Sequence, residues 1–172
     1  MIMLKLIDIH KTFNPGTINE KVALNGVDLH LNEGDFVTVI GGNGAGKSTM
    51  LNAVAGAWPV DSGKIIIGGT DVTKLSEYKR AAYLGRVFQD PMTGTAATMG
   101  IEENLALAKR RGKTRLLRPG ITKAERAEYK ELLKILNLGL EDRLTSKVGL
   151  LSGGQRQALT LLMATLQKPK LL

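Results

Sequence analysis

The first ninety residues carry the hydrophobic patterns of β-strands. Apolar and polar residues alternate over Met3–Ile9 and again over Val27–Leu31, the two-residue period of half-buried strands. Phe36–Ile40 is instead a continuous apolar and β-branched run, which predicts a central parallel strand covered on both faces. Gly63–Ile67 and Leu84–Phe88 are two further predicted strands, each followed by turn-forming residues. The pattern predicts a sheet in this half of the chain.

Helical patterns are found between these strands and dominate the rest of the chain. A glycine-rich turn leads into a predicted helix over Lys47–Ala55. Thr122 and Glu125 have the spacing of a capping box, and Ser152 can cap a last helix that stops before Pro169. Behind the capping box an apolar stripe recurs at helical spacing, formed by Tyr129, Leu132, Leu133 and Leu136. The layout predicts an α/β fold with an inserted helical block.

Composition excludes several classes of site. The chain has 172 residues, enough for one domain with a hydrophobic core. It has no cysteine and only two histidines, which excludes disulfides, thiolate zinc sites and histidine-rich metal sites. No stretch approaches the roughly 18 apolar residues of a membrane span. We therefore expect a cytosolic protein that acts at a membrane only through a partner.

The positive charge is concentrated in one short run. Lys and Arg number 24 against 16 Asp and Glu, a net charge of +8. A basic surplus can indicate nucleic-acid binding, but aromatics make up only 4% and none lies among the clustered charges, so no stacking platform is indicated. A solvated loop is the preferred interpretation of this run, which comprises Lys109, Arg110, Arg111, Lys113, Arg115 and Arg118.

A complete phosphate-loop motif precedes the first predicted helix. It matches G-x-x-x-x-G-K-[ST], and its glycines allow backbone N–H groups to wrap an anion at a helix N-terminus. The lysine supplies an ammonium for the β- and γ-phosphates, and the serine offers a hydroxyl oxygen to Mg²⁺. The position after an apolar strand makes a chance match improbable. The predicted nucleotide-binding residues are Gly41, Gly42, Asn43, Gly44, Ala45, Gly46, Lys47, Ser48 and Thr49.

A second motif lies at the start of the last predicted helix. Its serine, two glycines and free N–H groups form a potential anion site, although a simple capped helix start explains the same residues. The motif is formed by Leu151, Ser152, Gly153, Gly154 and Gln155.

With this motif the chain resembles the ATP-binding-cassette (ABC) family, whose signature is LSGGQ. The resemblance covers essentially the whole chain, in family order: Phe13 after the first strand, the phosphate loop, Gln89, a helical insertion and the signature. It implies an ABC-type phosphate-loop ATPase with an N-terminal antiparallel β subdomain. Residues 1–90 would form that subdomain and the RecA-like core, residues 91–150 the helical subdomain, and residues 151–172 the signature helix and the start of the Walker B strand.

The resemblance also implies roles for single residues. Phe13 would stack on adenine, although the family more often has tyrosine there and the loop 14–21 lengthens the spacing. A core or turn aromatic is the alternative. Gln89 would contact Mg²⁺ and the attacking water, with Ser48 as the other metal ligand, and a solvent-facing loop glutamine is the alternative. Leu151–Gln155 would close over an ATP molecule held by the opposite protomer.

The family's catalytic carboxylate is not found in this sequence. Lys170–Leu172 resembles the opening of the strand whose last aspartate coordinates Mg²⁺, and neither His10 nor His30 can serve as the downstream switch histidine because both precede the phosphate loop. We therefore expect a fragment of a longer ATPase, incomplete at its C-terminus, with weak or absent hydrolysis and a partly uncovered sheet.

The resemblance implies the MgATP-binding and hydrolysing subunit of a transporter. It would pair head to tail with a second ATPase subunit, bind separate transmembrane permease subunits on the inner face of the membrane, and serve a prokaryotic importer with an extracytoplasmic substrate-binding protein. Two alternatives stay open: a soluble cassette protein acting on ribosomes or DNA, and a module that binds ATP without turnover.

Overall fold

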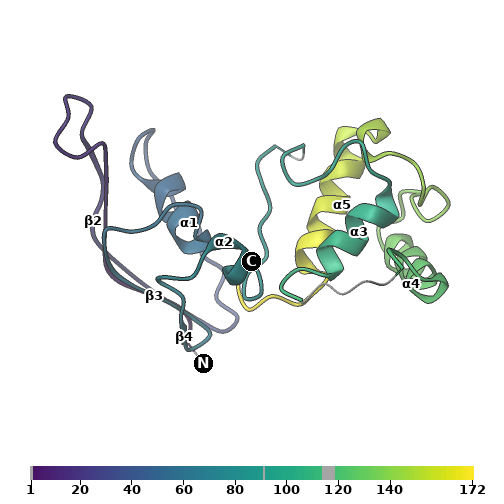
Figure 1. Ribbon diagram of the computed structural model, residues 1–172, viewed down its shortest axis with the longest axis horizontal. Coiled ribbons are helices and arrows are strands. Elements are labelled where there is room, and N and C mark those ends of the chain that lie inside the picture. The colour runs from purple at the N-terminus through teal and green to yellow at the C-terminus, as the bar shows by residue number, and fades with distance from the viewer. Residues whose placement is uncertain (1, 91, 114–118) are drawn as a thin grey trace. The chain divides into compact units, whose positions relative to one another are not determined.

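The computed structural model describes residues 2–90, 92–113 and 119–172, which form two compact units. The first unit comprises the described residues up to Leu84 together with Leu171, and the second comprises the described residues from Gly85 to Lys170 together with Leu172. Figure 1 shows both as ribbons. The first unit holds the sheet, and the second is helical.

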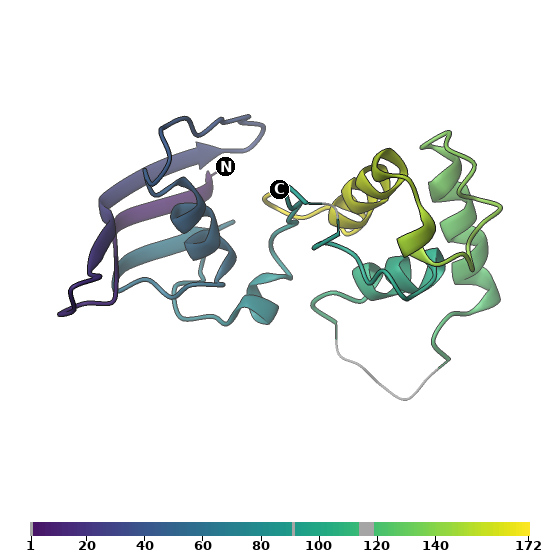
Figure 2. The same ribbon diagram turned by 90° about the horizontal axis from the view of Figure 1, so that it is seen from above.

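Four strands form one antiparallel sheet in the first unit. They are β1 (Ile2–Phe13), β2 (Lys21–Asn32), β3 (Ser62–Ile67) and β4 (Thr70–Asp71). Their order is β2-β1-β3-β4, so the long β1 lies between its two partners (Figure 2). This arrangement confirms the predicted antiparallel β subdomain and three of its strands.

An irregularity in β1 keeps apolar residues on the buried face. Leu4 and Leu6 are 3% and 2% exposed and pair with Ile67 and Ile65 of β3. Asp8 would continue this face, but it takes a positive φ of 49° and the register shifts between Leu6 and Ile9. The shift turns Ile9 into the core, where it is 1% exposed, because one extra residue reverses the alternation.

Helix α1 (Lys47–Ala55) has the predicted bounds and packs Ala53 and Val54 into this core. Met50 lies against the core as well, whereas Leu51 is 56% exposed. The end of α1 is held by Arg80, the last residue of α2 (Glu77–Arg80). Its guanidinium donates to the carbonyl oxygens of Ala53, Val54, Thr73 and Leu75.

Two predicted strands are wrong. Phe36–Ile40 is irregular in the structure, and the side chains of Phe36 and Ile40 are 93% and 91% exposed. Leu84–Phe88 is irregular apart from one parallel bridge between Leu84 and Leu171. A strand needs a neighbour to take up its backbone hydrogen bonds, and no described strand pairs with 36–40. Apolar character alone therefore did not make it a strand.

The second unit packs three helices around its own core. They are α3 (Ile101–Lys109), α4 (Lys123–Lys134) and α5 (Gly153–Thr165), and a single 3₁₀ turn, η1 (Val148–Leu150), precedes α5. The predicted capping box of α4 is present, since Glu125 N donates to Thr122 Oγ1 at 3.2 Å and the Glu125 carboxylate accepts from Thr122 N at 2.9 Å. The fully buried core residues are Ile101, Leu105, Tyr129, Leu133, Leu140, Val148 and Leu159.

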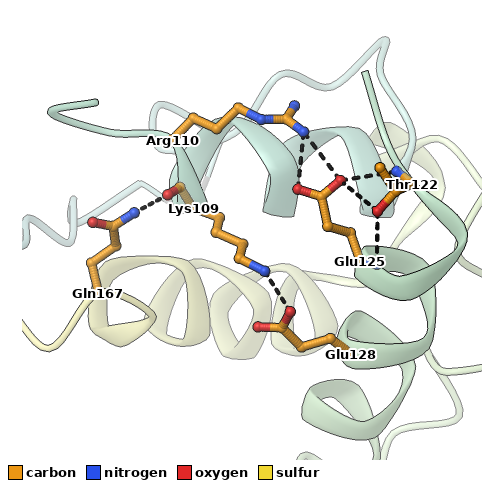
Figure 3. A network of polar contacts seen from close by, with 6 residues as sticks. All are labelled: Lys109, Arg110, Thr122, Glu125, Glu128 and Gln167. Atoms are coloured by element: carbon orange, nitrogen blue, oxygen red, sulfur yellow. Dashed lines mark hydrogen bonds and ion pairs between the residues drawn. The ribbon is translucent and has the colours of Figure 1, made fainter. Parts of the chain in front are cut away.

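The basic run is only partly the solvated loop that we expected. Lys109 forms an ion pair with Glu128, and Arg110 Nη2 lies 3.1 Å from Glu125 Oε1 (Figure 3). Arg111 donates to the carbonyl oxygen of Ala164 at 3.2 Å. These three cations connect the end of α3 to α4 and α5, so the interpretation was wrong for them. Lys113 is exposed, whereas Arg115 and Arg118 lie outside the described residues.

Candidate nucleotide-binding site

The phosphate loop leads directly into the N-terminus of α1. Gly46 is the N-cap, with a positive φ of 82°, and its carbonyl oxygen accepts from Met50 N at 2.8 Å. A Cβ atom at Gly46 would lie 2.5 Å from the carbonyl oxygen of Ala23 on β2. Both the backbone angle and this close approach require glycine. The motif's last glycine therefore fixes how the loop meets the sheet.

The side chain of Lys47 folds back over the loop. Its ammonium donates to the carbonyl oxygens of Gly41 and Gly42 at 2.7 and 2.8 Å. These bonds hold a cation beside the N-terminus of α1, where the backbone N–H groups have no helical partner. A bound phosphate would offer the same ammonium a charged acceptor, which makes shorter and stronger bonds.

One pocket joins the loop to the predicted adenine side chain. It has a volume of about 320 Å³ and is lined by Phe13, Lys21, Ala23, Asn43, Gly44, Ala45, Gly46, Lys47, Ser48 and Thr49. The tertiary structure thus brings Phe13, at the end of β1, to the phosphate loop, which begins 28 positions later at Gly41. Gly41 and Gly42 belong to the same loop, although they are not among the lining residues.

Phe13 is half-buried at the wall of this pocket, so it is not a core aromatic. The rings of Phe13 and Trp58 form a T-shaped pair, with centroids 5.2 Å apart and planes at 83°. The ammonium of Lys11 lies 5.6 Å from the ring centroid. These contacts hold the ring in place, whereas its stacking on adenine stays a prediction.

The signature residues begin α5 as predicted. Ser152 Oγ accepts from Gln155 N at 3.3 Å, and Gln155 Oε1 accepts from Ser152 N at 3.1 Å. Leu151 is 5% exposed and anchors the turn in the helical core. Gly153 and Gly154 are exposed, and a Cβ atom at either would meet open space. The helix start is therefore both capped and accessible.

Sequence reasoning missed the arginine that holds this turn. Arg156 is 9% exposed, and its Nη2 donates to the carbonyl oxygens of Val148, Gly149 and Leu151 at 3.0–3.3 Å. Three bonds from one rigid guanidinium fix the backbone that precedes Ser152. These bonds are to carbonyls of the preceding turn, and no motif in the sequence indicates them.

Gln89 is exposed and lies on irregular backbone in the second unit. Ser48, its proposed partner in holding Mg²⁺, belongs to the first unit, so their joint role stays a prediction. Ser48 is exposed at the pocket, and its hydroxyl is of the hard oxygen type that Mg²⁺ prefers. The described residues hold no cluster of three His, Cys, Asp or Glu that could bind a metal by itself.

No helix within the described ranges is both long and apolar enough to cross a bilayer. The sequence model of the family described as ABC transporter matches residues 24–172. The chain is 41% identical to the tyrosine transport ATP-binding protein of Clostridioides difficile (strain R20291), over 99% of this chain and 67% of that protein. It is 36% identical to the methionine import ATP-binding protein MetN of Rhizobium etli, over 99% of this chain and 44% of that protein.

Solved structures show the same likeness. The ATP-binding cassette MJ0796, in a dimeric post-hydrolysis state bound to ADP and Pi, is similar with a TM-score of 0.78 and 29% identity, over 97% of this chain and 71% of that one. A nucleotide-free ATP-binding cassette from an ABC transporter is similar with a TM-score of 0.75 and 28% identity, over 98% of this chain and 66% of that one. Family model, relatives and structures agree: this chain belongs to the ABC transporter family, among its ATP-binding subunits.

Proposed function

We propose that this chain is the ATP-binding and ATP-hydrolysing subunit of an ABC importer, in which MgATP-driven closure of two cassettes is coupled to transport. One observation carries the proposal: a single pocket joins Phe13 to the phosphate loop and to the ammonium of Lys47. A nucleotide needs this combination, since its base is aromatic and its tail is anionic.

Each part of the pocket has a task in nucleotide binding. The free N–H groups at the start of α1 bind the phosphate tail, and Lys47 leaves the carbonyls of Gly41 and Gly42 to bind the β- and γ-phosphates. Ser48 offers its hydroxyl to Mg²⁺, which balances the charge of the tail when bound. Phe13 stacks against the adenine.

Hydrolysis needs more than this pocket supplies. The ten lining residues include two lysines and no carboxylate, so none of them can accept a proton from an attacking water. Gln89 can orient a water through its amide but cannot deprotonate it at neutral pH. We therefore propose that the 172-residue chain binds ATP and hydrolyses it slowly by itself.

The exposed start of α5 supports dimerisation. Ser152, Gly153 and Gly154 leave N–H groups and the positive end of a helix accessible, which suits a phosphate presented by a second subunit. The cassette MJ0796 is described as a dimer bound to ADP and Pi. A head-to-tail pair would thus hold two ATP molecules, each between one phosphate loop and one signature helix.

The names of several relatives support an import function. They include methionine import and spermidine/putrescine import ATP-binding proteins, at 36% and 34% identity. The partners would then be separate permease subunits at the inner face of the membrane, together with an extracytoplasmic substrate-binding protein. Some relatives are named for an amino acid, tyrosine or methionine, so amino acids are the first substrates to test.

One relative favours a different direction of movement. The chain is 32% identical to the lipoprotein-releasing system ATP-binding protein LolD of Psychrobacter arcticus, over 73% of that protein. A release system needs no extracytoplasmic substrate-binding protein for uptake. Affinity purification from native membranes separates the two: a co-purifying permease with a substrate-binding protein supports import, and a permease without one supports release. Co-purifying RNA or DNA would instead favour a soluble cassette protein.

Calorimetric titration with MgATP tests the proposed site directly. We expect binding by the parent chain and an affinity lower by about tenfold or more for Lys47→Ala, which loses a charge-assisted phosphate contact. Lys5→Ala, at an exposed lysine of β1 outside the pocket, is the matched control and should bind like the parent. No binding by the parent, or equal affinities for both variants, would contradict the proposal.

A further inference from the structure

Lys21 stands at the edge of the nucleotide pocket, outside the phosphate-loop motif. It is the first residue of β2, and its Cα atom is the register partner of Phe13 at the end of β1. It lines the same pocket as Phe13 and the loop. A Cβ atom on Gly44 would lie 3.5 Å from Lys21 Nζ, so the ammonium lies beside the loop backbone.

No carboxylate among the described residues neutralises the charge of Lys21. Lys11, the other lysine beside Phe13, lies 2.9 Å from the carboxylate of Asp61. Within the described ranges the Lys21 ammonium has no ion-pair or hydrogen-bond partner. None of the residues lining the pocket carries a carboxylate. Lys21 and Lys47 are the two charged side chains of this lining. The pocket therefore presents two cations to any bound group.

The position of this second cation is set by the sheet. The pairs Thr12–Val22 and Phe13–Lys21 close the antiparallel ladder between β1 and β2. Because of this register, the Phe13 ring and the ammonium beside Gly44 lie at one end of the same strand pair. Lys47 is fixed separately, by the start of α1. Two elements far apart in the sequence thus each supply one cation.

We propose that Lys21 is a second phosphate-binding cation, which attracts the anionic tail of the nucleotide from the strand side of the pocket. This inference rests on the proposed nucleotide-binding function. A phosphate tail carries several negative charges, and an unpaired ammonium within its pocket lowers the free energy of the bound state. Lys21 is exposed, so solvent screens its effect, and the contribution is smaller than that of Lys47.

A graded series of charge changes tests the role of Lys21. MgATP affinity is measured by calorimetry at low salt for the parent chain, Lys21→Arg, Lys21→Met and Lys21→Glu. We expect parent-like affinity for Arg, a loss of about two- to fivefold for Met, and a larger loss for Glu, since an exposed charge contact contributes in this range. Methionine keeps the apolar stem, so the loss reports the charge. Lys5→Met is the matched control and should match the parent.

Salt separates an electrostatic role from a structural one. Raising the ionic strength from about 0.05 M to about 0.5 M shortens the screening length, so the difference between parent and Lys21→Met should shrink. A difference that persists at high salt, or equal MgATP affinities for the parent, Lys21→Met and Lys21→Glu, would overturn the inference. If the parent binds MgATP and the Lys21 variants match it, only this inference fails, whereas no binding by the parent means that the proposed function fails.

Discussion

Replacing Arg80 with methionine tests what holds the nucleotide-binding helix in place. Arg80 is 2% exposed, and its guanidinium reaches two carbonyls at the end of α1 and two of the segment before α2. The four bonds are 2.6–3.0 Å long, to Ala53, Val54, Thr73 and Leu75. Burial lowers the pKa of Arg80, and Asp71 raises it, but a guanidinium stays charged at neutral pH. Arg80 therefore places a cation at the negative end of the helix dipole.

The expected loss of stability follows from these contacts. Gly56 N also donates to Ala53 O, at 3.2 Å, so that carbonyl keeps a partner in the variant. The carbonyls of Val54, Thr73 and Leu75 have no second partner among the described residues. Three unsatisfied acceptors at about 1 kcal/mol each destabilise the fold by about 3 kcal/mol. Burying an apolar methionine costs less desolvation free energy than burying a guanidinium, which offsets part of this loss. We expect Arg80→Met to lower the free energy of unfolding by about 2–4 kcal/mol.

Urea unfolding followed by tryptophan fluorescence measures this loss. Trp58 is the only tryptophan, lies in the first unit and contacts Phe13, so its emission reports the unit that contains Arg80. Lys79→Met is the control, because it removes an equal charge from an exposed neighbour on the same helix and should change stability by less than about 0.5 kcal/mol. The free energy of unfolding of Arg80→Lys should lie between those of Arg80→Met and Lys79→Met. Equal unfolding free energies for Arg80→Met and Lys79→Met would refute the reasoning.

Three further predictions concern the phosphate loop, the signature helix and the capping box. Lys47→Ala should bind MgATP about tenfold or more weakly in calorimetry, and unchanged affinity would exclude the assigned pocket. Ser152→Arg should leave MgATP binding nearly intact, because Ser152 lies outside the pocket. It should prevent ATP-dependent dimerisation in sedimentation experiments, and equal dimerisation by variant and parent would contradict the signature assignment. The Thr122 backbone N–H, with help from Arg110, lowers the pKa of Glu125 below its ordinary value of 4.5. The ionised Glu125 carboxylate therefore stabilises the folded state fully above pH 4.5, and this stabilisation is lost as the pH falls through the folded-state pKa. The parent should therefore be more stable than Glu125→Gln at pH 7 and lose this advantage in acid, and a stability difference independent of pH would show that the charge has no such role.

Local patterns predicted much of the fold. Alternating apolar residues identified the antiparallel strands, and glycine, serine and threonine at the right spacing marked the starts of α1, α4 and α5. These signals depend on backbone angles and short-range hydrogen bonds, which neighbouring residues largely decide. Phe36–Ile40 was predicted wrongly because a strand depends on its partner, and partners are remote in the sequence. An apolar run by itself supplies no partner.

The candidate site divides in the same way. The motif Gly41–Ser48 names its own residues, because glycine, lysine and serine at fixed spacing meet the needs of a phosphate chain. Lys21 and Arg156 carry no such signal. Lys21 reaches the pocket through the register of β1 with β2, and Arg156 is recognised only by the three carbonyls that it binds. Sequence spacing cannot show contacts of this kind.

The sequence by itself determined that this protein has a phosphate loop and an ABC signature, since both are short motifs whose chemistry is complete within a few residues. Only the tertiary structure decided that Phe13, Lys21 and Lys47 share one pocket, and that Arg80 binds the last carbonyls of the helix that follows the loop. The reason is physical: a motif fixes backbone angles and functional groups locally, whereas the charge, walls and stability of a pocket come from elements that meet only when the chain folds.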